Sequence, residues 1–359
     1  MKINDVSVIP LNFKLKSPFE FSGVKLEILE YALVRIRTED GIFGYGECPA
    51  YWEPRNETQK STIDAVNNLA KELIGVTCDD IDGRKKLFNQ YIPSAYAAQC
   101  GIDVACYDIE GKVKDVPVAK LFGIPVKVPV EVAIPMTDEK TALGIVETAL
   151  DNNIQTYKLK VGKDIKKELK VLRKIRNKIG SNKKIFIDAN QAWKSADQAI
   201  EKINQFAQYD LCWVEQPLPA KATPEEYNEL QQKISVPIML DESVYTNKDV
   251  LVYNDSVKMF NIKLAKTGGI SGAIDFYNEV KKFNKKCMLG SMIEGSLGTL
   301  AGLHFASVYS MQTTALNSYD LINDKLSFGP KIIDGYMNVS NLPGLGYQDE
   351  SIFNKKFSR

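Results

Sequence analysis

The chain has 359 residues, of which 44% are hydrophobic and 25% are charged, enough apolar material for one large domain and a smaller one. Lysine plus arginine number 46 and aspartate plus glutamate 45, so no long-range positive field would attract nucleic acid or an anionic membrane. We therefore expect the partner to be a small molecule, with no nucleic acid and no membrane.

The cysteines and the N-terminus indicate the cellular compartment in which the protein is expected. The 6 cysteines include no C-x-x-C pair, which argues against a disulfide scaffold and a structural zinc site. Residues 1–10 predict no signal peptide, and no apolar run reaches the ~18 residues of a membrane span. We expect a cytoplasmic protein with reduced thiols. The single histidine, His304, nearly excludes a Ser-His-Asp triad and a multi-histidine metal site.

The first part of the chain predicts strands and then helices. Alternating apolar and polar residues indicate strands at 4–11, 31–38 and 43–47, the pattern of an antiparallel meander. Apolar residues at three-to-four spacing then indicate helices at 58–74, 82–89 and 95–113. This order is typical of an α+β domain, which we place at residues 1–120.

From residue 128 onward, short β-branched runs alternate with amphipathic helical stretches. The predicted strands are residues 130–134, 156–160, 184–188, 212–215, 237–240, 259–263, 287–290 and 313–316. Units of roughly 25 residues, repeated about eight times, favour a closed barrel over a doubly wound sheet. We predict an α/β fold in which residues 125–325 form a (β/α)8 TIM-like barrel. The tail, residues 326–359, has weak strand signals at 335–339 and is expected to pack back on the N-terminal α+β capping domain and complete it.

Charged residues stand at the ends of successive predicted strands, where the loops of a barrel build its site. The second strand ends in Y-K-L-K, so Lys158 and Lys160 share a face and point into the barrel mouth. The next three strands end in Asp188, Glu215 and Asp241. Three carboxylates at one rim repel each other unless a hard cation lies between them, which predicts Mg²⁺ or Mn²⁺.

The same residue types indicate a reaction. Lys266 follows the sixth strand, across the barrel, so Lys160 and Lys266 could flank a substrate from opposite faces. A cation bound to a substrate carboxylate stabilises the enediolate that forms when the α proton leaves. A lysine acts as a base when nearby positive charges destabilise its protonated form, as Lys158 and the metal ion would do here. The pattern predicts metal-dependent removal of the proton α to a carboxylate.

These residues lie in motifs that resemble the enolase superfamily, in its muconate-lactonizing enzyme subgroup. The motifs are Y-K-L-K-V-G, I-D-A-N-Q-A-W, V-E-Q-P-L, L-D-E-S and N-I-K-L-A-K-T-G-G-I, with G-Y-G-E-C-P at 44–49, P-V-A-K-L-F-G at 117–123 and G-S-M-I-E-G at 290–295. The resemblance therefore covers nearly the whole chain. It also implies a homo-oligomer.

The resemblance implies roles for the strand-end residues. The three carboxylates named above would be metal ligands, with Lys160 and Lys266 as the acid–base pair. Lys158 would contact the substrate carboxylate and help Lys160 to act as a base. Asn190 and Glu242 stand beside ligands and are expected to orient carboxylates or pair with lysines.

Further candidates line the expected pocket. Lys263 lies at the end of the sixth strand, Glu294 at the seventh and Asp320 beyond the eighth. In the family, specificity comes from the end of the eighth strand and from two loops of the small domain, here residues 18–25 and 50–58. Arg55 in the second loop could hold a distal carboxylate, as Lys25 in the first could.

The substrate stays open, because the subgroup racemises or epimerises amino-acid derivatives, cycloisomerises muconate, or dehydrates to o-succinylbenzoate. Dipeptide epimerases usually carry Asp-x-Asp at the eighth strand, and that pair falls here on Ala315 and Asn317. Glu53 or Glu57 could replace it as the partner of a substrate ammonium. The segment G-S-M-I-E-G-S-L-G-T-L-A is more typical of muconate cycloisomerases.

We rank racemisation or epimerisation of an amino-acid derivative or dipeptide first. The alternatives within the family are a muconate cycloisomerase and an o-succinylbenzoate synthase-type dehydratase. A non-catalytic barrel that binds a carboxylate would not need all three carboxylates together with the lysines. A Schiff-base aldolase would account for one lysine but not for the carboxylates.

Overall fold

The computed structural model of the chain describes residues 1–21, 24–50, 56–323, 329–347 and 349–357, with side chains described outside 19–25. Three predicted substrate contacts, Glu53, Arg55 and the Lys25 side chain, lie outside this description. No helix in the described part of the chain combines the length and the apolarity needed to cross a membrane.

The N-terminal sheet has three antiparallel strands in the order β1 (Ile3–Phe21), β2 (Val24–Thr38) and β3 (Phe43–Cys48). The predicted strands are confirmed, but β1 and β2 continue well past them, with Asn12 opposite Glu30 and Phe21 opposite Val24. Most of the predicted loop at 18–25 is therefore paired strand. This long hairpin carries residues of β2 towards the barrel.

Helices α1 (Gln59–Leu73) and α3 (Tyr96–Val113) cover this sheet, and α2 (Ile81–Tyr91) packs on α1. The α1 helix begins at a capping box, in which the Thr58 side chain accepts from the Ser61 N–H. A Cβ at Gly46 of β3 would lie 1.9 Å from the carbonyl oxygen of Gly101. Glycine at these positions lets α3 and β3 touch along their backbones.

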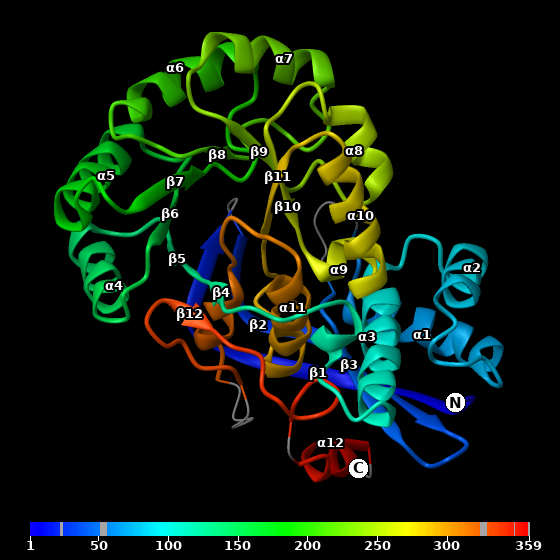
Figure 1. Cartoon of the computed structure of the whole chain (residues 1–359). Helices are drawn as coiled ribbons and strands as arrows, with labels where there is room; N and C mark the ends of the chain where they lie inside the picture. Colours follow the sequence, from blue (N-terminus) through cyan, green and yellow to red (C-terminus); the bar gives the residue numbers. More distant parts are fainter. Residues whose placement is uncertain (22–23, 51–55, 324–328, 348, 358–359) are drawn as a thin grey trace.

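Seven parallel strands form the barrel sheet, in the order β11-β10-β9-β8-β7-β6-β5. They are β5 (Glu131–Ile134), β6 (Thr156–Lys160), β7 (Lys184–Asp188), β8 (Val214–Glu215), β9 (Ile238–Leu240), β10 (Met259–Ile262) and β11 (Lys286–Leu289). Figure 1 shows helices α4 to α8 and α10 in an arc around these strands. The predicted TIM-like barrel is confirmed.

The barrel helices are α4 (Glu139–Asp151), α5 (Ile165–Ile179), α6 (Ala196–Ala207), α7 (Pro224–Lys233), α8 (Asn247–Tyr253), α9 (Leu264–Thr267), α10 (Ile270–Lys282) and α11 (Ser296–Val308). Their apolar faces pack on the sheet. His304 lies in α11, where it is 1% exposed and its Nδ1 accepts from the Ala119 N–H at 3.1 Å. Burial lowers the pKa of His304 to about 4, so it serves as a neutral acceptor in the core.

The predicted eighth strand at 313–316 is reduced to a bridge. Thr314 pairs in parallel with both Val130 and Leu289, so it joins the two edges of the seven-stranded sheet. The Glu131 N–H donates to the Thr314 carbonyl at 2.8 Å, and the Ala315 N–H donates to the Leu289 carbonyl at 2.9 Å. The strand ends there because the chain enters the 3₁₀ helix η2 (Leu316–Leu321) directly after Ala315.

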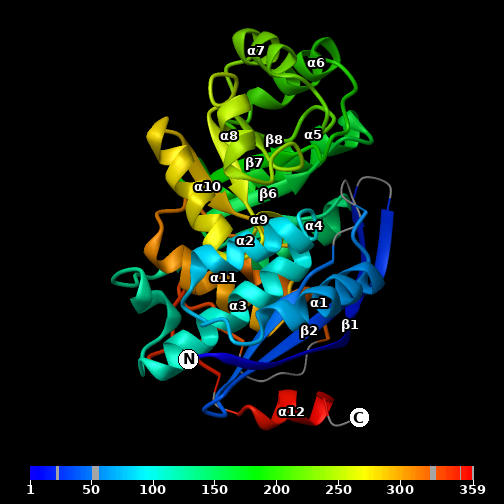
Figure 2. The same cartoon turned by 90° about the vertical axis from the view of Figure 1, so that its right-hand side faces the viewer.

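The C-terminal tail returns to the capping domain, as the fold prediction expected. Its strand β12 (Tyr336–Met337) pairs with β4 (Val128–Pro129), and its helix α12 (Ser351–Phe357) follows. Phe353 stacks on Tyr45 of β3 with ring centroids 4.7 Å apart, and Lys112 of α3 forms an ion pair with Glu350 at 2.6 Å. Figure 2 shows α12 beside the capping strands, far from the barrel helices.

A buried ion pair joins the capping domain to the barrel. Arg84 Nη2 lies 2.8 Å from Asp103 Oδ1, with both side chains 1% exposed. Asp103 also accepts from the Ser271 N–H at 2.9 Å and from its hydroxyl at 2.6 Å, at the start of α10. Helices α2, α3 and α10 therefore meet at one carboxylate.

Replacing Asp103 with alanine leaves the Arg84 guanidinium buried without a counter-ion. We expect Asp103→Ala to lower the free energy of unfolding by about 3–5 kcal/mol, measured by urea unfolding. The control is Asp275→Ala, whose ion pair with Lys85 is open to solvent, with side chains 46% and 31% exposed, and whose loss should cost about 1 kcal/mol or less. Equal losses in the two variants would contradict a special role for the buried pair.

Candidate active site

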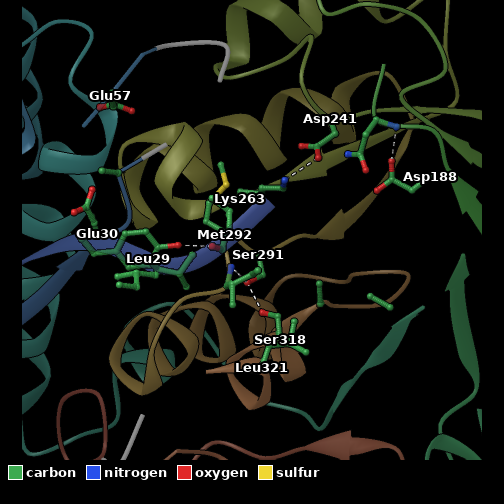
Figure 3. Close-up of a pocket in the computed structure, with 18 of the residues that line it drawn as sticks. Leu29, Glu30, Glu57, Asp188, Asp241, Lys263, Ser291, Met292, Ser318 and Leu321 are labelled. Carbon is green, nitrogen blue, oxygen red and sulfur yellow. Dashed lines mark hydrogen bonds and ion pairs between the residues drawn. The ribbon is translucent and has the colours of Figure 1, made fainter. Parts of the chain in front are cut away.

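A cavity of about 400 Å³ lies between the carboxyl ends of the barrel strands and the capping domain. The capping domain contributes residues from β2 and from the start of α1, and the barrel contributes Lys158, Lys160, Asp188, Asn190, Asp241 and Lys263. Figure 3 shows Asp188, Asp241 and Lys263 at one end of the cavity and Glu30 and Glu57 at the other. The cavity is therefore charged at both ends.

Lys160 stands at the end of β6 and is held by two neighbours. Its Nζ donates to Asp188 Oδ2 at 2.6 Å and to Asn190 Oδ1 at 2.6 Å. The Asn190 amide in turn donates to Glu242 Oε1 at 2.9 Å. The predicted pairing of Asn190 and Glu242 with the ligand and lysine groups is present, although Glu242 does not line the cavity. Burial, together with the charge of Asp241, raises the pKa of Glu242 to about 7.

Lys158 is bound to a carboxylate that the sequence analysis missed. Its Nζ lies 2.9 Å from Oε1 of Glu131, which is 0% exposed in β5. It also lies 3.7 Å from Glu215 Oε2 and 4.0 Å from Asp188 Oδ2. The signal for Glu131 was a single charged residue inside the apolar run V-P-V-E-V-A-I.

The surroundings of Lys158 keep its ammonium charged. Burial works against the charge, but Glu131, Glu215 and Asp188 outweigh it and raise the pKa of Lys158 above its usual value. Burial likewise raises the pKa of Glu131, which Lys158 opposes. A permanently charged Lys158 is suited to attract a carboxylate rather than to accept a proton.

Glu215 carries an oxygen without a hydrogen bond. Its Oε1 accepts from the Asn261 amide at 2.7 Å, whereas its Oε2 is buried with no hydrogen-bond donor among the described residues. Burial and the charge of Asp188 raise the pKa of Glu215 to about 8. The Lys158 ammonium lies 3.7 Å from this Oε2, beyond hydrogen-bond distance, so a bound cation in direct contact would stabilise the ionised carboxylate.

Asp241 pairs with both lysines of the sixth strand end. Lys263 Nζ lies 2.8 Å from its Oδ2 and Lys266 Nζ 2.6 Å from its Oδ1. Although burial opposes it, these two charges lower the pKa of Asp241 below its usual range. The carboxylate therefore stays ionised.

The two lysines differ in what they face. Lys263 lines the cavity, whereas Lys266 does not, because its Nζ also donates to the backbone carbonyls of Asp241 at 2.7 Å and Asn261 at 3.0 Å. Alternate residues of a strand share a face, so Lys263 lies on the interior face with Asn261. Lys266 sits in α9 beyond the strand end, and burial lowers its pKa. This arrangement departs from the predicted placement of Lys266 beside the substrate.

The three predicted ligands fit a hard cation chemically. In the described part of the chain, no three His, Cys, Asp or Glu side chains come close enough to hold an ion, and Asp188 and Asp241 are each paired with a lysine. The donors are nevertheless all carboxylate oxygens on neighbouring strands, with Asp188 opposite Glu215 in the sheet register. Glu215 Oε2, which accepts no hydrogen bond among the described residues, suits the same chemistry.

Two other predicted pocket residues lie outside the cavity wall. Glu294 accepts from the Met292 N–H at 2.9 Å and from the Ser291 hydroxyl, and so supports two residues that do line the cavity. Asp320 lies in η2, where its neighbours Ser318 and Leu321 line the cavity and it does not. The eighth strand end therefore presents no carboxylate to the cavity among the described residues.

Comparison with known proteins gives a consistent picture. Residues 3–123 match the family described as mandelate racemase / muconate lactonizing enzyme, N-terminal domain, and residues 144–350 match enolase C-terminal domain-like proteins. An N-succinyl-L-Arg/Lys racemase from Bacillus cereus is 27% identical, over 85% of this chain and 84% of that protein. A hydrophobic dipeptide epimerase from Enterococcus faecalis is 30% identical, over 88% of this chain and 90% of that protein.

Solved structures agree in fold. A dipeptide epimerase from Enterococcus faecalis, complexed with Mg and the dipeptide L-Leu-L-Tyr, has a TM-score of 0.91 at 27% identity, covering 96% of this chain and 99% of that one. A muconate lactonizing enzyme from Pseudomonas fluorescens, complexed with muconolactone, has a TM-score of 0.91 at 25% identity, covering 99% and 98%. The chain therefore belongs to the mandelate racemase / muconate lactonizing enzyme family of the enolase superfamily, and it is an isomerase.

Proposed function

We propose that the protein racemises or epimerises an amino-acid derivative by removing the proton α to its carboxylate and returning it to the opposite face. The observation that carries this proposal is the pair Lys160 and Lys263. Both line one cavity. Lys160 stands at the end of β6 and Lys263 at the end of β10, and three strands lie between β6 and β10 in the sheet. A substrate between them would present one face of its α carbon to each lysine.

Each lysine is held by a different carboxylate, Lys160 by Asp188 and Lys263 by Asp241. In one direction neutral Lys160 takes the α proton while the Lys263 ammonium delivers a proton to the other face, and in the reverse direction the roles exchange. We assign this role to Lys263 rather than Lys266, because the Lys266 ammonium is bonded to backbone carbonyls away from the cavity.

The carboxyl groups Asp188, Glu215 and Asp241 would hold Mg²⁺, which when bound stabilises the negative charge that develops on the substrate carboxylate oxygens. Lys158 would add a fixed positive charge to the same end of the substrate. Glu131 keeps that ammonium in place and ionised. Mg is present in the solved structure of the related dipeptide epimerase.

The opposite end of the cavity suggests the rest of the substrate. Glu30 of β2 and Glu57 before α1 line it, and the wall between the two ends is mainly aliphatic, with Leu29, Ile293 and Leu321. Among the described lining residues, all cations lie at the other end. A substrate with a carboxylate at one end and an ammonium or guanidinium at the other matches this distribution. A dicarboxylate such as muconate does not.

The proposed reaction is tested by α-proton exchange in D₂O with Mg²⁺, using a library of dipeptides, N-acyl amino acids and muconate. We expect deuterium to enter one class of amino-acid derivative, with loss of chirality at the α carbon. NMR and mass spectrometry would measure this exchange. Consumption of muconate without exchange in the other compounds would assign a cycloisomerase instead. Absence of both would overturn the proposal.

Single-base variants test the assignment of the lysines. With the substrate so identified, Lys160→Met and Lys263→Met should each reduce racemisation by about 10²–10⁴-fold. Each should retain deuterium exchange from only one enantiomer, and the retained enantiomer should differ between the two. The matched control is Lys266→Met, which should keep exchange from both enantiomers. Loss of exchange from one enantiomer in Lys266→Met, with Lys263→Met unaffected, would reverse the assignment.

Removing the charge of Glu131 tests the role of Lys158. We expect Glu131→Gln to reduce kcat/KM by about 10–100-fold, because the Lys158 ammonium loses its nearest counter-ion. Glu131→Asp should restore part of the activity, and the pH dependence of kcat/KM should shift in Glu131→Gln alone. Wild-type activity and pH dependence in Glu131→Gln would show that Lys158 needs no such partner.

Glu30 tests the charge preference of the far end. We expect Glu30→Gln to raise KM about tenfold for a substrate with a distal cation, with little change in kcat, since the contact is equal in ground and transition states. The same variant should leave KM unchanged for an analogue in which the cation is replaced by an alkyl group. A parallel rise for both substrates would mean that Glu30 acts on the shape of the cavity and not through its charge.

A further inference from the structure

A second cavity, of about 660 Å³, lies at the opposite end of the barrel from the active-site cavity. Its lining residues stand at or just before the starts of strands β7, β8, β10 and β11, among them Lys184, Trp213, Met259 and Lys286. The interior side chains Phe186, Met239 and Met288 form one apolar cluster with Trp213 and Met259. The two cavities therefore lie on opposite sides of the barrel core.

Positive charge gathers around this second cavity. Four of its lining residues are lysines, namely Lys184, Lys258, Lys285 and Lys286. In the part of the chain that the structure describes, no carboxylate oxygen lies within 4.0 Å of any of their ammonium nitrogens. Lysines of the outer helices differ, since Lys178 pairs with Glu147 at 2.7 Å and Lys233 with Glu229 at 2.7 Å.

The lysines of the cavity repel each other. Burial and the neighbouring charge of Lys258 lower the pKa of Lys285, and Asp255 only partly compensates. Lys285 is held there by its hydrogen bond to the Val257 carbonyl at 3.0 Å. Like charges held together with only partial compensation by a carboxylate favour the binding of an anion between them.

Part of the cavity wall is aromatic and apolar. Trp213 is 3% exposed, and its indole N–H has no hydrogen-bond acceptor among the described residues. Its ring packs on Phe186 with centroids 4.5 Å apart, which fixes its position. The indole nitrogen has almost no solvent-accessible surface, so it belongs to the barrel core rather than to the open surface of the cavity. Met259 and Phe283 make the neighbouring wall apolar.

We infer that this cavity is a second binding site, for a small organic anion whose acidic group meets the lysines and whose apolar body lies against Trp213, Met259 and Phe283. A carboxylate, sulfonate or phosphate would pair with the ammonium groups. The inference is independent of the proposed racemase reaction, because none of its residues lines the active-site cavity.

Cys212 offers a reporter inside the cavity. It lines the cavity and is half-buried, whereas the other cysteines, at positions 48, 78, 100, 106 and 287, are buried. The rate at which iodoacetamide alkylates Cys212, followed by peptide mass spectrometry, therefore measures access to this site. The probe is naphthalene-2-sulfonate, an aromatic anion, and its neutral counterpart is naphthalene-2-methanol.

At a concentration of about four times its Kd, naphthalene-2-sulfonate should slow the alkylation of Cys212 about fivefold, and naphthalene-2-methanol should not. The protection should disappear in Lys184→Gln/Lys258→Gln/Lys286→Gln, a variant of three exposed lysines of the cavity. It should persist in a control with the same change of charge on α5, Lys166→Gln/Lys167→Gln/Lys170→Gln.

A second measurement needs no variant. Iodoacetate is itself a small anion, and the lysines should concentrate it near Cys212. The ratio of the iodoacetate rate to the iodoacetamide rate should therefore be about tenfold higher for Cys212 than for free glutathione. Cys212 protonation affects both reagents equally, so the ratio reports the local field. Absence of protection by the sulfonate, or equal protection in the two triple variants, would overturn the inference and leave the lysines as solvated surface groups.

Discussion

The balance of buried charge at the mouth of the barrel is the constraint on which the rest of the site depends. Five buried carboxyl groups, Glu131, Asp188, Glu215, Asp241 and Glu242, face four buried lysines, Lys158, Lys160, Lys263 and Lys266. Each such charge loses its hydration on folding, and only close pairing in a low-dielectric interior offsets that cost. When all are ionised, one negative charge remains, and Oε2 of Glu215 accepts no hydrogen bond among the described residues.

This balance divides the lysines by function. Lys158 and Lys266 are surrounded by acceptors on the inner side of the site, Lys158 by three carboxylates and Lys266 by a carboxylate and two carbonyls. Lys160 and Lys263 line the cavity, as Lys158 does, and have Asp188 and Asp241 beside them. In the proposed function, the first pair sets the electrostatic field and the second pair exchanges protons with a substrate. The barrel supplies this arrangement, and the capping domain closes the cavity over it.

The sequence predicted the barrel well where strands are short β-branched runs ending in charged residues. The bounds of β6 and β7 are as predicted because Y-K-L-K and I-F-I-D both end at the rim of the barrel. The predicted eighth strand is reduced to a bridge at Thr314. Its length depends on pairing with both edges of the sheet, and sequence periodicity does not predict how those edges align. The strands β1 and β2 ran longer because cross-strand pairing, not local composition, extends them. The domain boundaries at 120, 125 and 325 stay predictions.

The candidate site was predictable in composition but not in detail. Strand order brought Asp188, Glu215 and Asp241 to one rim, as expected. To choose between Lys263 and Lys266 for the proposed role, one must know where β10 ends and α9 begins. That boundary decides which of the two lysines, three positions apart, faces the cavity. The sequence analysis missed Glu131 because a lone glutamate in an apolar strand belongs to no motif. Its role is recognised only from the structure, in which Lys158 lies 2.9 Å away.

The most direct test of the charge balance is a calorimetric titration of the purified protein with Mg²⁺. The account predicts one Mg²⁺ per chain in the wild type and loss of binding in Glu215→Gln, which removes the ionised oxygen that has no hydrogen-bond donor. Unchanged Mg²⁺ binding in Glu215→Gln, or no binding in the wild type, would contradict the view that this cluster of carboxylates and lysines is built around a cation.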